Sequence, residues 1–186
     1  MAKWYELGPF TVFDVETTGF SPRNDRMVEL AALRIDRDGT ETEFHTLIHP
    51  GRPIPACASR VHHITDAMVQ DAPHFPRIGH SFLQFISGTT LVAHNARFDL
   101  GFLQESLNRG GLPLWKGNTM DTLLLSRRVY PEIASRKLQD LRVLLDLPDP
   151  SYGTGQAHRA GADVLWTKEL LKHLLECILS RREEQP

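Results

Sequence analysis

Cysteine is scarce in this sequence: Cys57 and Cys177 are the only two in 186 residues, and no CxxC pair is present. This scarcity excludes a small disulfide-stapled scaffold and a cysteine-rich zinc fold. Two thiols so far apart predict reduced cysteines and a cytoplasmic protein.

Long apolar runs are also lacking. Residues 1–10 hold no apolar stretch of the kind found in a signal peptide, and the Leu-rich C-terminal segment is interrupted by Lys172, His173 and Glu176. A membrane helix needs roughly 20 consecutive apolar residues. We therefore expect no association with a membrane.

A strong positive charge is the third feature that is missing, since the formal net charge is −2. This balance disfavours a protein that coats nucleic acid through many phosphate contacts. It does not exclude an enzyme that holds a short strand end, because clustered carboxylates lower the total charge and bound metal ions restore positive charge locally.

What is present is the composition of a globular protein, with 41% hydrophobic and 24% charged residues. The prolines and glycines fall between periodic segments, as turn residues do. We predict a single domain over residues 1–186, with its core at about 9–180 and a frayed tail at Arg181–Pro186.

The first third of the chain predicts an antiparallel meander. Pro9–Glu16, Met27–Asp36 and Thr40–His49 have the pattern of strands, and Asp38-Gly39 is a hairpin turn signal. Pro50–Pro76 is rich in turn residues, with one short helix expected near Thr65–Val69. The remaining expected elements are a helix at Arg77–Ile86, a strand at Thr90–Ala93, helices at Ala96–Leu107, Asp121–Val129 and Leu138–Leu145, a mobile loop at Gly153–Gly155, and a long helix at Ala157–Ser180. Together they predict a mixed sheet with helices on both faces.

A pair of acids near the end of the first strand is the first candidate for chemistry. In FDVETTG, residues 13–19, the period of two places Asp14 and Glu16 on one face and Phe13 and Val15 on the other. Two carboxylates on so apolar a strand are costly unless positive charge lies between them, and Mg²⁺ or Mn²⁺ prefers oxygen ligands. The alternative is that Glu16 has left the sheet and both acids are solvated.

Two further motifs carry acids beside helix starts. In HNARFD, residues 94–99, Asn95 is a candidate N-cap and Asp99 suits the first turn of a helix, which explains it without a catalytic role. HRAGAD, residues 158–163, opens the last helix. Five helical residues turn through about 500°, so His158 and Asp163 face the same way only if His158 lies at or before the helix start.

In this order and at these separations, the three motifs resemble those of the DEDDh exonuclease superfamily over about Thr11 to Leu175. The chain looks most like the proofreading (epsilon) subunits of bacterial DNA polymerase III and their stand-alone relatives. The four-residue gap between His158 and Asp163 fits the histidine subgroup better than the tyrosine subgroup. The resemblance implies an α/β, RNase H-like fold, a mixed five-stranded sheet with an antiparallel meander of three strands, then two parallel strands, and helices on both faces.

The resemblance also implies a two-metal mechanism with Mg²⁺ or Mn²⁺. Asp14 would bridge two divalent cations, Glu16 and Asp163 would complete the inner site, and Asp99 would hold the outer cation largely through water. His158, with an ordinary pKa of about 6.5, would take the proton from the attacking water. The expected reaction releases 5′-mononucleotides from the 3′ end of single-stranded DNA or RNA.

Substrate contacts are expected around the same motifs. By the resemblance these are Thr17, Thr18 and Gly19 against the terminal sugar and its 3′-OH, Phe20 and Ile64 on bases, and His94, Asn95 and Phe98 in the second motif. We interpret Asp121 as a helix cap and His62 and His63 as loop residues near the substrate. Arg97, Arg136, Lys137 and Arg159 are candidates for phosphate contacts or for a solvated face.

Three other functions stay open at this point. An RNase T-like or oligoribonuclease-like enzyme would use the same motifs on RNA, and a phosphodiesterase acting on a small nucleotide would share the metal chemistry. A non-catalytic nucleic-acid-binding subunit could use the same fold, although it would be expected to have lost an acid or the histidine. By the resemblance, a replicative subunit would carry an extended tail that tethers it to its DNA polymerase, and we expect no such tail after the last helix. A DNA polymerase is therefore a candidate partner, and the oligomeric state is not predicted.

Overall fold

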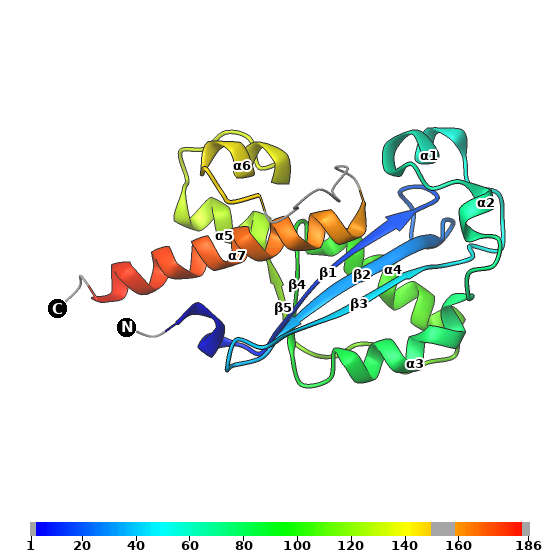
Figure 1. Cartoon of the computed structure of the whole chain (residues 1–186), viewed down its shortest axis with the longest axis horizontal. Coiled ribbons are helices and arrows are strands. Elements are labelled where there is room, and N and C mark those ends of the chain that lie inside the picture. The colour runs from blue at the N-terminus through cyan, green and yellow to red at the C-terminus, as the bar shows by residue number, and fades with distance from the viewer. Residues whose placement is uncertain (1–2, 150–158, 184–186) are drawn as a thin grey trace.

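The apolar segment Met27–Ile35 lies between two other strands in a five-stranded mixed sheet with the order β3-β2-β1-β4-β5. This is seen in the computed structural model, which describes residues 3–149 and 159–183. The pairs β1–β2 and β2–β3 are antiparallel, and β1–β4 and β4–β5 are parallel (Figure 1). The predicted fold class is therefore confirmed.

The strands are β1 (Phe10–Thr17), β2 (Met27–Ile35), β3 (Glu41–Leu47), β4 (Thr90–Ala93) and β5 (Thr119–Asp121). The helices are the 3₁₀ turn η1 (Trp4–Leu7) and α1 (Ala56–His62), α2 (Asp66–Val69), α3 (Phe75–Phe85), α4 (Ala96–Arg109), α5 (Thr122–Val129), α6 (Leu138–Leu144) and α7 (Ala160–Glu183). In the described part of the chain, no helix has both the length and the apolar character that a bilayer crossing requires.

The sheet separates two hydrophobic layers. Phe13 and Val15 pack on one face with residues of α3 and α4, whereas Phe10 and Val12 pack on the opposite face with residues of α7. Helices α5 and α6 lie on the same side as α7, which crosses the sheet diagonally (Figure 1). Because side chains alternate along β1, this division places every second residue of the strand beneath α7.

The predicted elements are found with small shifts at their ends, and three short elements were not located from the sequence: η1, α1 and β5. Helix α1 begins directly after Pro55 in a segment that we expected to be mostly loop, because its seven residues are too few to show a helical period. Strand β5 has only three residues. Asp121, predicted as a helix cap at the start of the helix at Asp121–Val129, is the last residue of β5 and the N-cap of α5, so its capping role is confirmed.

The turn at Asp38-Gly39 connects β2 and β3 as predicted. Gly39 has a φ of +86° and its N–H donates to the carbonyl of Asp36, while the Asp36 N–H donates to the carbonyl of Thr40. Glycine occupies this left-handed conformation without the steric cost that a Cβ would add. The expected mobile loop at residues 153–155 and the last three residues of the chain, 184–186, lie outside the described residues. The expected fraying from Arg181 is wrong for residues 181–183, because α7 continues to Glu183.

Candidate active site

Asp14 and Glu16 lie on the face of β1 that carries α7. Phe13 and Val15 fill the opposite core, so the alternation along the strand leaves the two acids as neighbours beneath the start of α7. Both side chains are partly exposed. The interpretation in which Glu16 has left the sheet is wrong, since it pairs with Glu29 of β2 before the register shifts at Thr17.

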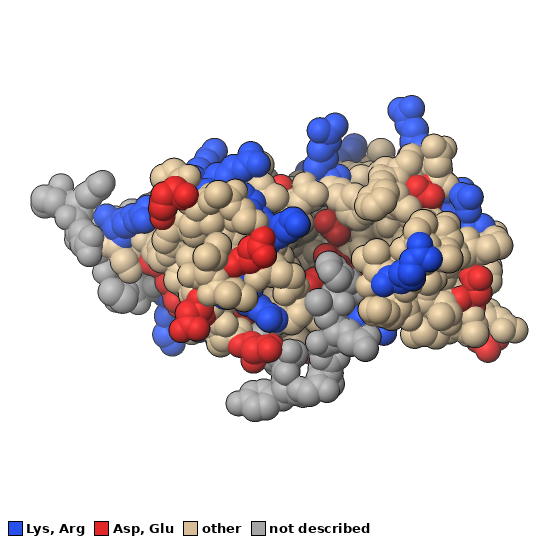
Figure 2. Space-filling view, turned by 90° about the horizontal axis from the view of Figure 1, so that it is seen from above, with Lys and Arg blue, Asp and Glu red and all other residues tan. Residues whose placement is uncertain are grey.

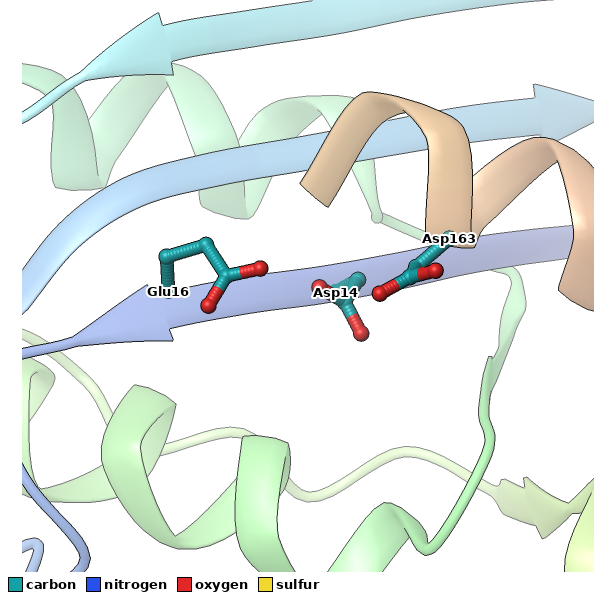
Figure 3. A group of neighbouring side chains, drawn as sticks. All are labelled: Asp14, Glu16 and Asp163. Atoms are coloured by element: carbon teal, nitrogen blue, oxygen red, sulfur yellow. The ribbon is translucent and has the colours of Figure 1, made fainter. Parts of the chain in front are cut away.

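Asp163 joins this pair from the first turn of α7. Carboxylate oxygens of Asp14, Glu16 and Asp163 all lie within 4.8 Å of one another. Figure 3 shows the three side chains converging from β1 and α7 on one shared space. Residues almost 150 positions apart in the sequence are thus brought to one point by the packing of α7 on β1.

Asp99 lies in the first turn of α4, which packs on the face of the sheet opposite α7. The parallel pairing of β1 with β4 stops at Val12↔Val92, which leaves backbone groups of β1 without a strand partner beyond that point. The Val15 N–H donates to Oδ1 of Asp99 at 3.1 Å, and Asp99 is only 3% exposed. Asp99 is therefore held beside the Asp14–Glu16 segment by the strand itself.

The electrostatics of this group favour protonated carboxyls when no cation is bound. Burial raises the pKa of Glu16 to about 9, and the charges of Asp163, Glu29 and Asp99 contribute to the rise. Burial also raises the pKa of Asp99 to about 8, and burial with the neighbouring acids raises the pKa of Asp14 well above its usual range. Crowded carboxylates that are this difficult to ionise fit a divalent cation bound among them.

The space-filling view shows acidic side chains inside a hollow. Seen from above, they lie near the middle of this face, and Lys and Arg side chains are present on the surface on either side of it (Figure 2). Acidic groups in a hollow with cationic side chains nearby are suited to metal ions and to a phosphate backbone that approaches them.

The comparisons with known proteins agree with this geometry. Residues 11–171 match the model of a family described as exonuclease. The chain is 38% identical over 173 residues to DNA polymerase III subunit epsilon of Treponema pallidum (strain Nichols), covering 92% of this chain and 78% of that protein. The chain belongs to the DEDDh exonuclease family. Members of this family are hydrolases that act on phosphodiester bonds.

A relative and a solved structure extend this result. A DNA polymerase III subunit epsilon-like protein of Rhodobacter capsulatus is 40% identical over 175 residues, which cover 92% of this chain but only 24% of that protein. Exonuclease X in complex with 5′ overhanging duplex DNA has 27% identity and a TM-score of 0.68, with 92% of each chain covered. The DEDDh exonuclease domain is thus shared with proteins of very different length.

The predicted base of this DEDDh exonuclease, His158, lies outside the described residues. The structure describes the chain again from Arg159, whose carbonyl accepts the N–H groups of Ala162 and Asp163 at 2.9 and 3.1 Å. The expectation that this motif opens the last helix is confirmed for Asp163, which lies in the first turn of α7. The position of His158 relative to the acids stays a prediction.

The turn after Glu16 holds the predicted sugar contacts in a tight conformation. Thr17 Oγ1 donates to the carbonyl of Gly19 at 2.6 Å, and Thr18 exchanges hydrogen bonds with the backbone of Arg26. A Cβ on Gly19 would lie 2.5 Å from Asp25 Oδ2, so a larger residue here would have to displace the Asp25 carboxylate, which accepts the Ser21 N–H. Phe20 follows with 90% of its surface exposed.

The other residues expected to contact substrate differ in how far they are exposed to solvent. Asn95 is exposed and Phe98 is partly buried against Phe102. Ile64 is 0% exposed, packed with Val28, Ile54 and Val69, so its predicted contact with a base would require the α1–α2 segment to move. His62 is also buried, whereas His63 is exposed.

His94 has both ring nitrogens engaged within the protein. Nε2 lies 2.7 Å from the carbonyl of Arg136, which can only accept, so Nε2 carries the proton. Nδ1 then accepts the hydroxyl of Thr122 at 2.9 Å. Burial lowers the pKa of His94, in keeping with this neutral tautomer. A substrate contact by His94 would have to break one of these bonds.

Asp121 has a larger role than the helix cap that its sequence position suggested. Its Oδ1 accepts the N–H of Leu123 at the start of α5 and the N–H of Asn95, while Oδ2 accepts the N–H of Ala96 at the start of α4. Asn95 itself has a φ of +66° and makes no side-chain cap, contrary to expectation. One carboxylate therefore caps two helices, one of which carries Asp99.

We expect Asp121→Ala to destabilise the protein by about 1–3 kcal/mol, because losing a helix cap typically costs ~0.5–2 kcal/mol and this residue caps two helices. Urea unfolding monitored by circular dichroism measures the change, with the exposed Asp71→Ala as the matched control. A loss no larger than that of the control would contradict the double cap.

Two residues near the acids were not singled out from the sequence. Gln139 of α6 donates to Asp163 Oδ1 at 3.4 Å, and nothing in its sequence context distinguishes it. Glu29 is 0% exposed in β2, opposite Glu16. A lone acid within an otherwise continuous apolar strand was a signal that could have identified Glu29, because an unpartnered buried carboxylate is too costly to keep.

Proposed function

We propose that this chain is a 3′→5′ exonuclease that releases 5′-mononucleotides from single-stranded DNA ends, using two divalent cations and His158 as the general base. The observation that carries the proposal is the convergence of Asp14, Glu16 and Asp163 within 4.8 Å, with Asp99 held beside them by the Val15 N–H. Membership of the exonuclease family supports the same reaction.

Each acid has a distinct place in this proposal. Asp14, Glu16 and Asp163 would hold one cation, and Asp99 would hold a second together with Asp14. Bound cations, Mg²⁺ or Mn²⁺, would supply charge stabilisation to the attacking and leaving oxygens of an in-line displacement at phosphorus. Gln139, bonded to Asp163 Oδ1, would orient that carboxylate. His158 would accept the proton of the attacking water on a ring nitrogen.

The turn at Thr17-Thr18-Gly19 would receive the terminal nucleotide. The Thr17 and Thr18 hydroxyls are already bonded to the turn itself, so the turn is preorganised next to Glu16. Phe20 presents an exposed ring directly after it, and an aromatic face contributes roughly 1–3 kcal/mol per stacked base. These features support a bound single-stranded end.

DNA is the proposed polymer because the relatives named above are DNA polymerase III epsilon proteins, and exonuclease X was solved with DNA. The same relatives support a DNA polymerase as a partner. Cys57 and Cys177 are both free thiols, which supports the cytoplasmic location proposed from the sequence.

An assay on end-labelled strands tests this function. Single-stranded DNA and RNA of equal sequence, labelled at the 5′ end, are incubated with Mg²⁺, Mn²⁺ or EDTA. We expect a ladder of stepwise shortening on DNA that EDTA abolishes, and a 3′-labelled strand should release labelled mononucleotide first. Binding without shortening under either metal would support the non-catalytic subunit instead. Preferential shortening of RNA would contradict DNA as the substrate and would support an RNase T-like or oligoribonuclease-like exonuclease.

His158→Ala should lower the rate by roughly 10²–10⁴-fold near neutral pH, the usual contribution of a general base. Part of the loss should be recovered at high pH, where hydroxide replaces the missing base. The pH–rate profile between pH 6 and 10 measures this, with His173→Ala, a histidine of α7, as the control. A profile parallel to that of the wild type would remove His158 from this role.

A further inference from the structure

Glu29 is a charged residue in the most buried strand of the sheet. Its side chain is 1% exposed, and it lies opposite Glu16 in the β1–β2 register. A fifth carboxylate so close to the acidic group adds repulsion to it, and the charge of Glu29 contributes to the raised pKa of Glu16. A buried charge in such a place needs compensating partners.

The partners of Glu29 come mainly from the start of α7. Arg159 donates from Nε to Oε1 and Oε2 at 3.2 and 3.1 Å and from Nη2 to Oε1 at 2.7 Å, and the Ala160 N–H donates to Oε2 at 3.1 Å. Nε2 of His45 in β3 forms a further hydrogen bond with Glu29 Oε1 at 2.8 Å. Burial alone would raise the pKa of Glu29, but the hydrogen bonds from His45 and Arg159 outweigh it and lower that pKa to about 2.

This arrangement substitutes for a helix cap. The Arg159 carbonyl accepts the first helical N–H groups, so Arg159 occupies the N-cap position of α7. The side chain of an N-cap residue commonly accepts a further backbone N–H. An arginine side chain has no acceptor. Glu29 supplies the acceptor from β2 and binds the guanidinium as well. Asp121 does the same for α4, so the helices that carry Asp99 and Asp163 are both capped by a carboxylate from the sheet.

We propose that Glu29 and Arg159 form a positioning pair that fixes the start of α7 and holds Asp163 at Asp14 and Glu16, and that Arg159 serves this pair rather than a substrate phosphate. The proposal rests on the exonuclease function proposed above. Its geometric basis is that Nε and Nη2 of Arg159 are both bound to Glu29, while the first turn that they anchor contains Asp163.

The test compares Glu29→Gln, Arg159→Lys and Arg159→Met with Glu41→Gln. Glu41 pairs with Lys168 at 3.4 Å, so the control removes an ion pair between the same helix and the sheet that lies further along α7. The measurements are kcat and KM on single-stranded DNA, the salt dependence of DNA binding, and hydrogen exchange of the peptide containing Ala160–Asp163.

Glu29→Gln and Arg159→Met should each lower kcat by roughly 10²-fold with KM little changed, since a displacement of about 1 Å of a catalytic group has this effect. The double variant should be no slower than either single variant, because the two residues act as one unit. Arg159→Lys should retain part of the rate through a single ionic contact. Glu41→Gln should keep the wild-type kcat.

Hydrogen exchange provides a readout that does not depend on activity. The amides of Ala160, Ala162 and Asp163 should exchange faster in Glu29→Gln than in the wild type. Their exchange rates should be unchanged in Glu41→Gln. Unchanged exchange and unchanged kcat in Glu29→Gln would overturn the proposal. So would a raised KM and a salt slope lowered by ~1 in Arg159→Met alone, which is the signature of a phosphate contact. An inactive wild type with these exchange changes present would instead contradict the exonuclease function.

Discussion

Asp14→Asn is expected to lower the Mg²⁺-dependent exonuclease rate by at least about 10³-fold and, in EDTA at pH 9, to make the protein more stable. The loss of rate follows because Asp14 is placed to contact both cations, which are worth several kcal/mol to the transition state. The gain in stability follows because burial and the charges of Asp99, Asp163 and Glu16 oppose the ionisation of Asp14 in the metal-free protein.

Removing a carboxyl whose pKa is raised by burial and by neighbouring acids removes the cost of ionising it at pH 9. We therefore expect Asp14→Asn to melt at a higher temperature than the wild type under these conditions. Thermal unfolding and a strand-shortening assay measure the two effects, with Asp36→Asn outside the site as the control. A variant that keeps the wild-type rate, or melts lower in EDTA at pH 9, would contradict this account.

The second large effect is an inverted pH dependence of the metal-free protein. The pKa values of Glu16 and Asp99 in the folded chain, about 9 and about 8, lie above their ordinary values of 4.5 and 3.8. Between these limits the folded state binds more protons than the unfolded state, so stability falls as pH rises. The loss begins near pH 4–5 and is complete near pH 9.

Glu29 acts in the opposite sense at low pH. Its folded pKa of about 2 is below the ordinary value of 4.5, so its contribution is present above pH 4.5 and is lost as pH falls toward 2. In EDTA we therefore expect maximal stability near pH 5, measured by thermal unfolding across pH 3–9. Mg²⁺ should restore stability mainly on the alkaline side, because cation binding displaces protons from the acids.

Glu16→Gln provides the control for this profile. It removes one of the raised carboxyl groups, so the alkaline decline in EDTA should become shallower while the acidic limb, which belongs to Glu29, should be unaffected. A wild-type stability that stays level or increases from pH 6 to pH 9 in EDTA would show that these acids ionise freely and would not support a cation site.

Local patterns were sufficient for part of this site. The period of two along β1 predicted that Asp14 and Glu16 share a face, and the position of Asp163 in the first turn of α7 followed from the helix start. The ordered motifs predicted the family through resemblance, and with it the mixed five-stranded sheet of an antiparallel meander followed by two parallel strands. These features depend on residues that are close together in the sequence or on strings that can be recognised.

Features that depend on long-range contacts were not predictable. Asp99 is held by the Val15 N–H only because β4 ends early, and Asp121 reaches α4 only because β5 lies beside β4. Strand β5 has three residues and was too short to show a period. The role of Glu29 depends on its hydrogen bonds to Arg159, which is 130 positions away. Each of these contacts depends on which segments become neighbours in the fold.

Crystals of the protein soaked in Mn²⁺ and measured for anomalous scattering test the convergence of the acids most directly. This account predicts two peaks that share Asp14, one of them within coordination distance of Glu16 and Asp163 and the other toward Asp99. Carboxylates without an anomalous peak at a Mn²⁺ concentration that supports strand shortening would contradict it.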